Sequence, residues 1–440
     1  MSCKESLRVL GGVLAGMAIG LAVLVLGAHW WLNRYLHGEA FRQLISAKTA
    51  AALRAEGEYL PLHWSGTTAY SDGFHARGLP GAALRELRAD QIRAEVVLSG
   101  LLRNEWRISG LDVQRLTAKV GQSSDANASS APRQAERSAV RVELEPLRIH
   151  DGNIEWTMGG VFSGAVRRAR MVVKFGEGSW EASASSGELR LGDVQPLRIE
   201  QAHARFQREA VFVTDSLLHM ADGGKVTVNG QIAHDSDLTL RHDGVPVDPW
   251  LPKDWRGKLI GKARGESRVR GRLGEPNALS AEGNIELSHG KLEALPVLNR
   301  LAVFTGSEQF RQLELHKART DYTWTPARLT LQRLAMESTG LLRVEGGCVV
   351  EKGALNGEFD VGVASATLRW LPGARARVFT VERDGYQWTK VKLQGPTDNI
   401  QEDLSSRLIA AAGTQLFEDT KGVVQKGAET LLGIFHKLTQ

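Results

Sequence analysis

The chain has 440 residues, of which 42% are hydrophobic and 6% aromatic, and this length suits a large core or two to three domains. Its 55 Lys and Arg nearly balance its 50 Asp and Glu, which leaves a formal net charge of +5. The basic residues are neither clustered nor interleaved with aromatic residues, so the composition argues against a nucleic-acid-binding protein.

An apolar run over residues 10–32 predicts a membrane anchor. About 20 apolar residues match the hydrocarbon thickness of a bilayer, and Trp30 and Trp31 fit the aromatic belt at its interface. A cleaved signal peptide is the alternative, because Lys4 and Arg8 precede the run. The run is longer than the usual core of a signal peptide and has no clear cleavage site, so we expect an uncleaved transmembrane helix.

This anchor also predicts where the chain resides. We expect residues 1–9 to form a cytoplasmic tail and the bulk of the chain to lie in the periplasm, as in a single-pass inner-membrane protein. Cys3 and Cys348 would then lie on opposite sides of the membrane, which excludes a disulfide bond between them. Two cysteines so placed also exclude a Cys-based metal site.

Beyond the anchor, the longer helices are predicted near the two ends of the chain. Residues 33–57 are expected to form a juxtamembrane helix, with good helix formers over 39–54. Residues 400–440 are expected to form an amphipathic helical tail. Packing of this tail on a sheet is favoured over contact with a membrane.

The region between these helices predicts strands. Short alternating segments separated by turn dipeptides fill residues 58–275, which indicates antiparallel meanders. Within them, residues 121–138 lack periodicity and predict a flexible loop. Residues 276–399 are expected to form a second β region, with a short helix near 293–304.

The stretch over residues 279–363 shows the strand pattern most clearly. Apolar and polar residues alternate, so each strand has one apolar and one polar face. Predicted helices are too few to cover so much sheet, and an exposed apolar surface of this size would aggregate unless it were filled. We therefore expect a mainly β fold, an elongated, curled antiparallel sheet that forms a β-groove for acyl chains. The residues expected to line this groove are Ile285, Leu287, Leu329, Leu331, Leu341, Phe359, Val361 and Val363.

The sequence contains no motif for catalysis or metal binding. It has no phosphate-binding Gly-Lys-Ser/Thr loop, no His-Glu-x-x-His and no Gly-x-Ser-x-Gly. Acidic pairs such as Glu358 and Asp360 fall on the expected polar face of a strand. We therefore expect no catalytic residues, no metal, no cofactor and no enzymatic activity.

A strand, a Gly turn, a Pro-containing helix and a strand meander follow one another over residues 281–302, 313–319, 329–347 and 353–361. This order resembles the C-terminal region of the AsmA-like family of Gram-negative envelope proteins, relatives of TamB and YhdP. That family in turn resembles the chorein-type bridge proteins, which carry lipids along a β-lined groove. The resemblance covers about half of the chain, implies a groove fold, and supplies no catalytic residues.

Together these patterns predict a membrane-anchored periplasmic protein that binds acyl chains and supports phospholipid transport or outer-membrane homeostasis. Its expected partners are phospholipid acyl chains, the inner membrane and other envelope proteins. Two alternatives stay open. One is an envelope scaffold that assists outer-membrane protein assembly; the other, less favoured, is an envelope hydrolase whose site is built from distant residues.

Overall fold

The computed structural model describes residues 34–419, with gaps at 35, 98–104, 122–140, 145, 159–161, 177–178, 193, 208–209, 252, 273–274, 294–297, 299–301, 303–306, 371 and 398. The predicted tail over 1–9 and the predicted anchor over 10–32 lie outside the described residues. Among the residues that are described, no helix is both long enough and apolar enough to cross a bilayer. The chain divides into two compact units, Met1–Phe212 (unit 1) and Val213–Gln440 (unit 2).

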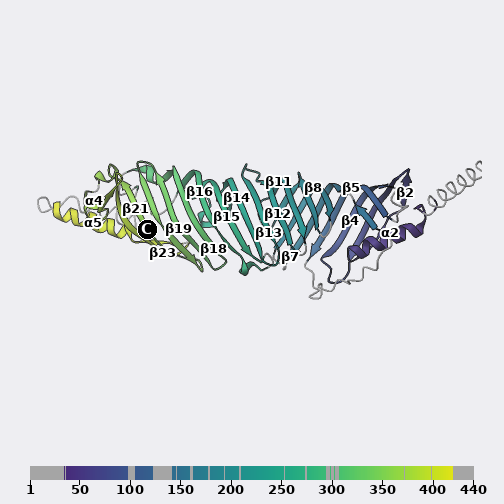
Figure 1. Cartoon of the computed structure of the whole chain (residues 1–440). Helices are drawn as coiled ribbons and strands as arrows, with labels where there is room; N and C mark the ends of the chain where they lie inside the picture. Colours follow the sequence, from purple (N-terminus) through teal and green to yellow (C-terminus); the bar gives the residue numbers. More distant parts are fainter. Residues whose placement is uncertain are drawn as a thin grey trace, which may run out of the picture. The chain divides into compact units, whose positions relative to one another are not determined.

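Strands dominate both units, so the fold is mainly β, as the alternating pattern predicts (Figure 1). The first elements in chain order are α2 (Glu39–Ala52), β1 (Ala55–Tyr59), β2 (Leu62–Ser65), β3 (Thr68–Gly78), β4 (Leu84–Val97), β5 (Glu105–Gly121), β6 (Arg141–Leu144), β7 (Leu147–Met158), β8 (Phe162–Gly176), β9 (Ser179–Ser185), β10 (Glu188–Leu191), β11 (Leu197–Gln207) and β12 (Ala210–His219). The following strands are β13 (Lys225–Ile232), β14 (Ser236–Pro246), β15 (Leu259–Gly271), β16 (Ser280–Glu293), β17 (Gln312–Leu315), β18 (Lys317–Thr325), β19 (Arg328–Ser338), β20 (Leu342–Glu351), β21 (Ala354–Ala364), β22 (Val381–Arg383), β23 (Tyr386–Pro396) and β24 (Gln401–Glu402). The remaining helices are η2 (Asp248–Trp250), η3 (Lys253–Trp255), η4 (Pro276–Ala278), η5 (Glu308–Phe310), η6 (Thr367–Trp370), α4 (Pro372–Arg377) and α5 (Leu404–Asp419).

The sheet of unit 1 is antiparallel except at one place. Its spatial order runs from β3 through β4, β5, β7 and β8 to β11. The short strands β1 and β2 both pair with the free side of β3, and β9 and β10 both lie between β8 and β11. Strand β5 pairs with β6 and β7 in parallel, so the antiparallel pairing predicted for the sheet does not hold at this place. Parallel pairing needs a connection longer than a hairpin turn, and β5 and β6 are separated in the chain by residues 122–140, which lie outside the described part. Apart from Gly121, which ends β5, the loop predicted over 121–138 lies outside the described residues.

Helix α2 covers the outer edge of β1. The backbone N–H of Tyr59 donates to Ser46 Oγ at 3.0 Å, and the Tyr59 carbonyl oxygen accepts a hydrogen bond from Arg42 Nη1 at 2.8 Å. An open strand edge offers free backbone groups to other chains, so these contacts remove a site of aggregation. The helix occupies most of the 39–54 segment that is rich in helix formers. The sequence predicts a juxtamembrane helix that extends to residue 57, but β1 already begins at Ala55.

The sheet of unit 2 is antiparallel in all the pairings described. Its order is β13, β14, β15, β16, β17 with β18, β19, β20, β21 and β23, and β22 and β24 both pair with the far side of β23. The sequence predicts that one β region ends at residue 275 and the next begins at residue 276. That position falls in the connection between β15 and β16, which pair along most of their length.

β-Bulges interrupt the alternation of faces in both units. Arg168, His289 and Arg333 lie at register shifts inside strands, with φ of 53°, 52° and 49°. Gln91 of β4 also has a positive φ, of 54°, although its strand keeps its register with β3 and β5 there. A bulge adds one residue to a strand and increases its local twist. Around Arg333, Leu331 and Leu334 therefore pair with Cys348 and Gly346 of β20 although they are three residues apart.

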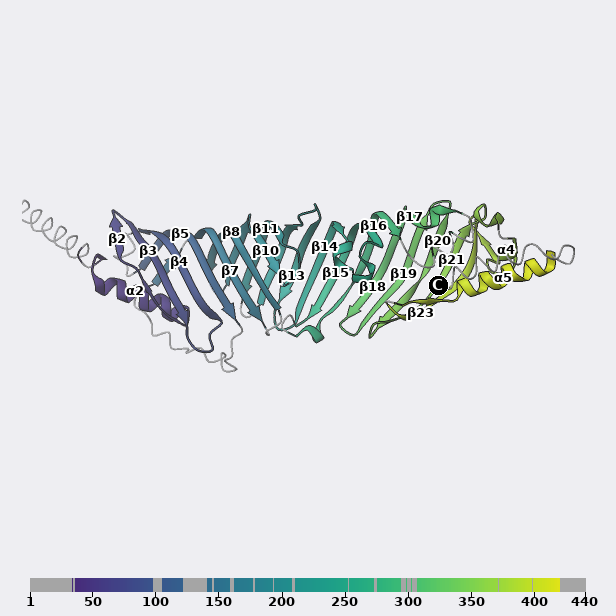
Figure 2. The same cartoon turned by 180° about the vertical axis from the view of Figure 1, so that it is seen from behind.

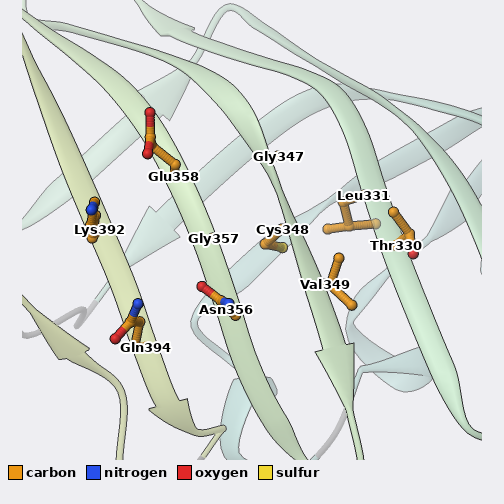
Figure 3. Close-up of a pocket in the computed structure, with 10 residues that line it drawn as sticks. All are labelled: Thr330, Leu331, Gly347, Cys348, Val349, Asn356, Gly357, Glu358, Lys392 and Gln394. Atoms are coloured by element: carbon orange, nitrogen blue, oxygen red, sulfur yellow. The ribbon is translucent and has the colours of Figure 1, made fainter.

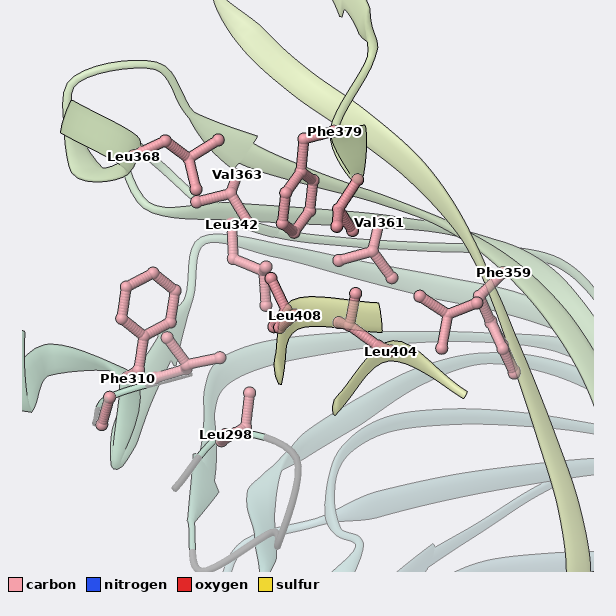
Figure 4. Packing of buried hydrophobic residues seen from close by; sticks show 14 of the residues in the cluster. Leu298, Phe310, Leu342, Phe359, Val361, Val363, Leu368, Phe379, Leu404 and Leu408 are labelled. Atoms are coloured by element: carbon pink, nitrogen blue, oxygen red, sulfur yellow. The ribbon is translucent and has the colours of Figure 1, made fainter. Parts of the chain in front are cut away.

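The hydrophobic core of unit 2 gathers at one end of its strands (Figure 4). Phe310, Val363 and Phe379 are fully buried there, and α5 contributes Leu404 and Leu408. Helices α4 and α5 lie at the β21 and β23 end of the unit in both views (Figure 1, Figure 2). The packing of α5 matches the expectation that the tail lies on the sheet, and residues 420–440 lie outside the described part.

A second helical segment reaches the same core. Leu298 and Ala302 are helical and 3% exposed, within the region where the sequence predicts a short helix near 293–304. Both side chains belong to the core cluster of unit 2. The other residues between 294 and 304 lie outside the described part.

The edge of β23 is also occupied. Strands β22 and β24 pair with its two ends. Between them, the Lys392 N–H donates to Asp403 Oδ1 at 2.9 Å, and the Lys390 carbonyl oxygen accepts a hydrogen bond from Arg407. The backbone groups at this end of the sheet therefore have partners.

Candidate ligand-binding face

Cross-strand register places the apolar residues of unit 2 on one face of the sheet, which we call the inner face; the opposite face is the outer face. Residues directly opposite each other on paired strands project to the same side. One row across β16 to β21 consists of Leu287, Ala318, Met336, Val344 and Val361. A row nearer the other end of the strands consists of Ala281, Trp324, Leu329, Val350 and Leu355.

The two faces differ sharply in charge. None of the described, register-paired positions on the inner face of β13–β21 carries Asp, Glu, Lys or Arg. On the outer face, Arg264 Nη2 lies 2.8 Å from Glu286 Oε1, and Arg241 Nη2 lies 3.0 Å from Glu266 Oε2. The hydrogen bond from Arg264 lowers the pKa of Glu286, so that this carboxylate stays ionised on the wet face.

The inner face is closed at one end of the strands and open at the other. On β20 and β21, Leu342 is 6% exposed and Val363 is fully buried, because the helices of unit 2 pack over them. Farther along, Leu329 and Val350 are half-buried and Trp324 is 37% exposed. The open end therefore presents apolar side chains to solvent.

The predicted groove residues divide between these two ends. The closed core contains Phe359, Val361 and Val363. The half-buried residues that pack against this core are Leu287, Leu331 and Leu341. The half-buried residues outside the core cluster are Ile285 and Leu329.

Some inner-face residues were missed by the sequence pattern. Leu341 lies in the turn before β20, and it is Leu342 that stands opposite Val363. Three polar residues, Ser267, Tyr322 and His242, also lie on the inner face. The sequence could have predicted the inner-face position of His242, because this residue continues the two-residue spacing of Leu238 and Leu240.

Two hollows in the described surface are lined mostly by polar residues. In unit 2, a hollow of about 380 Å³ is lined chiefly by Thr330, Asn356, Glu358, Lys392 and Gln394 (Figure 3). In unit 1, a hollow of about 470 Å³ is lined chiefly by Tyr70, Asp72, Arg93, Asp112 and His150. Leu331 is the one predicted groove residue that borders either hollow, so neither coincides with the inner face.

Burial shifts the pKa of two titratable groups on the inner face toward their uncharged forms. Burial lowers the pKa of the half-buried His242, although the nearby Asp243 opposes this shift. Burial also raises the pKa of the Cys348 thiol. Within the described residues, no group of three or more His, Cys, Asp or Glu side chains could hold a metal ion.

Comparison of the chain with protein-family models, with curated proteins and with solved structures finds no match. The geometry of the inner face therefore carries the functional argument.

Proposed function

We propose that this chain is a membrane-anchored periplasmic protein that binds phospholipid acyl chains on the inner face of its sheet and supports phospholipid transport or outer-membrane homeostasis. The observation that supports this proposal is the lack of Asp, Glu, Lys and Arg at the described inner-face positions of β13–β21. The apolar side chains at the open end of this face are stabilised in water when an apolar ligand covers them.

An acyl chain suits this face for physical reasons. It removes apolar surface from water at about 25 cal/mol per Å² and needs no polar partner. Trp324, Leu329 and Val350 offer such surface at the open end. Bulges such as the one at Arg333 add twist, which favours the curled groove predicted from the sequence.

The resemblance to the AsmA-like family agrees with this proposal and stays a prediction, because no comparison identifies that family. The predicted anchor over residues 10–32 would tether the chain to the inner membrane, which supplies phospholipid. Lipid binding and membrane attachment would then serve the same task.

The scaffold alternative is less favoured if it works by adding a partner strand to a sheet edge. At β1 the backbone of Tyr59 is bonded to α2, and at β23 the backbone of Lys390 and Lys392 is bonded to Arg407 and Asp403. An added strand would have to displace these hydrogen bonds.

A matched pair of substitutions on β19 tests the proposal. Leu329 projects to the inner face, and its neighbour Thr330 projects to the outer face, where it lines the hollow. We expect Leu329→Glu to reduce the phospholipid retained in native mass spectrometry by about tenfold or more, because an acyl chain would desolvate the new charge. Thr330→Glu should retain lipid as the unaltered protein does.

Equal lipid content in all three proteins would contradict the proposal, as would an unaltered protein that carries no lipid after gentle detergent extraction. Thermal melting followed by circular dichroism shows whether both variants keep their fold. Phe359, Val361 and Val363 are unsuitable for this test, because a carboxylate in the closed core would unfold the unit.

A further inference from the structure

We propose that the inner face of unit 2 recognises the ester carbonyl of an acyl lipid at a polar spot formed by Ser267, Tyr322 and His242. This inference rests on the proposed function and adds a chemical preference to it. The spot interrupts rows whose other described residues, Thr320 apart, are apolar or glycine. Thr320, another polar residue of this face, already donates to the carbonyl oxygen of Gln332 at 3.1 Å.

Tyr322 and Ser267 are joined across an intervening strand. Register places Tyr322 of β18 opposite Gly283 of β16, and Gly283 opposite Ser267 of β15. Because Gly283 has no side chain, the tyrosine ring can pass over it, and its hydroxyl donates to Ser267 Oγ at 2.7 Å. The hydroxyl proton of Ser267 has no acceptor among the described residues. A hydroxyl that accepts one hydrogen bond becomes a stronger donor in the next.

His242 lies beside this pair. His242 stands on β14 opposite Gly265 of β15. Ser267 also lies on β15, two residues after Gly265. Such diagonal neighbours on one face are about 7–8 Å apart, close enough for two side chains to reach one ligand group. The ring is half-buried, and it has no hydrogen bond to any other residue in the described part of the chain. Gly265 leaves the space between the histidine and Ile285 without a side chain.

The chemistry of these groups selects the ligand. A serine hydroxyl and a neutral imidazole can donate hydrogen bonds but carry no positive charge. A phosphate or a carboxylate is normally bound by Arg or Lys, and the described inner-face positions of β13–β21 have neither. The carbonyl oxygen of an ester is neutral and needs only such donors. An acyl chain on the apolar rows would place its ester here and leave a charged headgroup outside the face.

The experiment compares two phospholipids with the same headgroup and chain length, one with ester-linked acyl chains and one with ether-linked alkyl chains. Competition between them for the full-length protein in detergent is measured by native mass spectrometry. We expect the unaltered protein to prefer the ester lipid by about fivefold, as one net hydrogen bond implies. Ser267→Ala should lose this preference by weakening ester binding while ether binding is unchanged. Tyr322→Phe, which keeps the ring, should reduce the preference.

Ser280→Ala is the matched control, because Ser280 lies on the outer face of β16 next to Ala281, and it should keep the full preference. Retained ether binding shows that each variant is folded. Equal binding of both lipids by the unaltered protein, or an undiminished preference in Ser267→Ala, would overturn the inference and leave the proposed function standing. Failure to bind either lipid would overturn both.

Discussion

Asn229 Oδ1 accepts a hydrogen bond of 2.7 Å from the backbone N–H of Asp215. Asp215 lies within β12 in the left-handed region, with φ of 44°. The same arrangement occurs in unit 1, where Asn153 Oδ1 accepts the backbone N–H of Arg168 at 3.1 Å. In both places an asparagine side chain satisfies the backbone amide of a residue that has positive φ inside a strand.

Removal of this acceptor should weaken β12 around Asp215. We expect Asn229→Ala to lower the free energy of unfolding by about 1 kcal/mol, because the Asp215 amide loses its partner at a solvent-exposed position. Urea unfolding measures the change. Asn356→Ala, at an exposed site on the outer face of β21, is the control and should change stability by less than about 0.5 kcal/mol. Equal effects of the two substitutions would show that the hydrogen bond contributes nothing.

The positive φ of Gln91 in β4 permits a test of backbone strain. Its φ of 54° costs a residue with a Cβ atom about 1–2 kcal/mol, and a β-branched side chain fits this conformation worst. We expect Gln91→Gly to be at least as stable as the unaltered protein and Gln91→Val to be about 1 kcal/mol or more less stable. Thermal or urea unfolding compares them. Gln114→Val, at a strand position without positive φ, should be nearly neutral. A valine tolerated equally at both sites would argue against the strain.

Helix α5 should be held on the sheet chiefly by its buried leucines. Leu404 is 1% exposed in the core of unit 2, whereas Ile409 of the same helix is 38% exposed. We expect Leu404→Ala to cost about 2–5 kcal/mol, because it removes buried methyl groups and leaves a cavity. Ile409→Ala should cost less than about 1 kcal/mol. Urea unfolding gives both values, and similar losses would show that α5 does not close the core.

Alternation of polar and apolar residues predicts much of this fold. The pattern over 279–363 yields the mainly β class, and the spacing of Leu329 and Leu331, or of Phe359, Val361 and Val363, places each set on one face. The parallel pairing of β5 with β7 is not visible in the pattern, because alternation does not encode strand direction. The predicted groove residue Leu341 lies in a turn, and Leu342 takes the inner-face position instead, because a turn residue can continue the apolar spacing of a strand.

Bulges limit how far the candidate site can be predicted. At Arg333 the inner-face positions of β19 shift by one residue, so a strict two-residue period fails between Leu331 and Leu334. The distinction between the closed core and the open end depends on which strands lie under α4 and α5, and that is a matter of tertiary packing. The polar contact of Tyr322 with Ser267 joins residues 55 positions apart, beyond any local pattern.

Titration of His242 should make unit 2 less stable in mild acid. Burial lowers its pKa in the folded state below the ordinary value of 6.5, while the unfolded chain keeps that value. Well above pH 6.5 the ring is neutral in both states and contributes no pH dependence. As the pH falls below 6.5, the unfolded state binds the proton first, so the free energy of unfolding declines until the folded-state pKa is passed. Urea unfolding from about pH 7.5 to about pH 5 measures this decline.

His242→Leu isolates the contribution of the imidazole. The variant should show a flatter dependence of stability on pH over that window, because it lacks the group that titrates there. Carboxylates such as Glu286, whose pKa is held below 4.5 by the hydrogen bond from Arg264, lose their stabilising contribution only at more acidic pH. Both proteins should therefore lose stability together once the pH falls below about 4.5. An unchanged slope between about pH 7.5 and 5 in the leucine variant would show that His242 is as well solvated in the folded protein as in the unfolded chain.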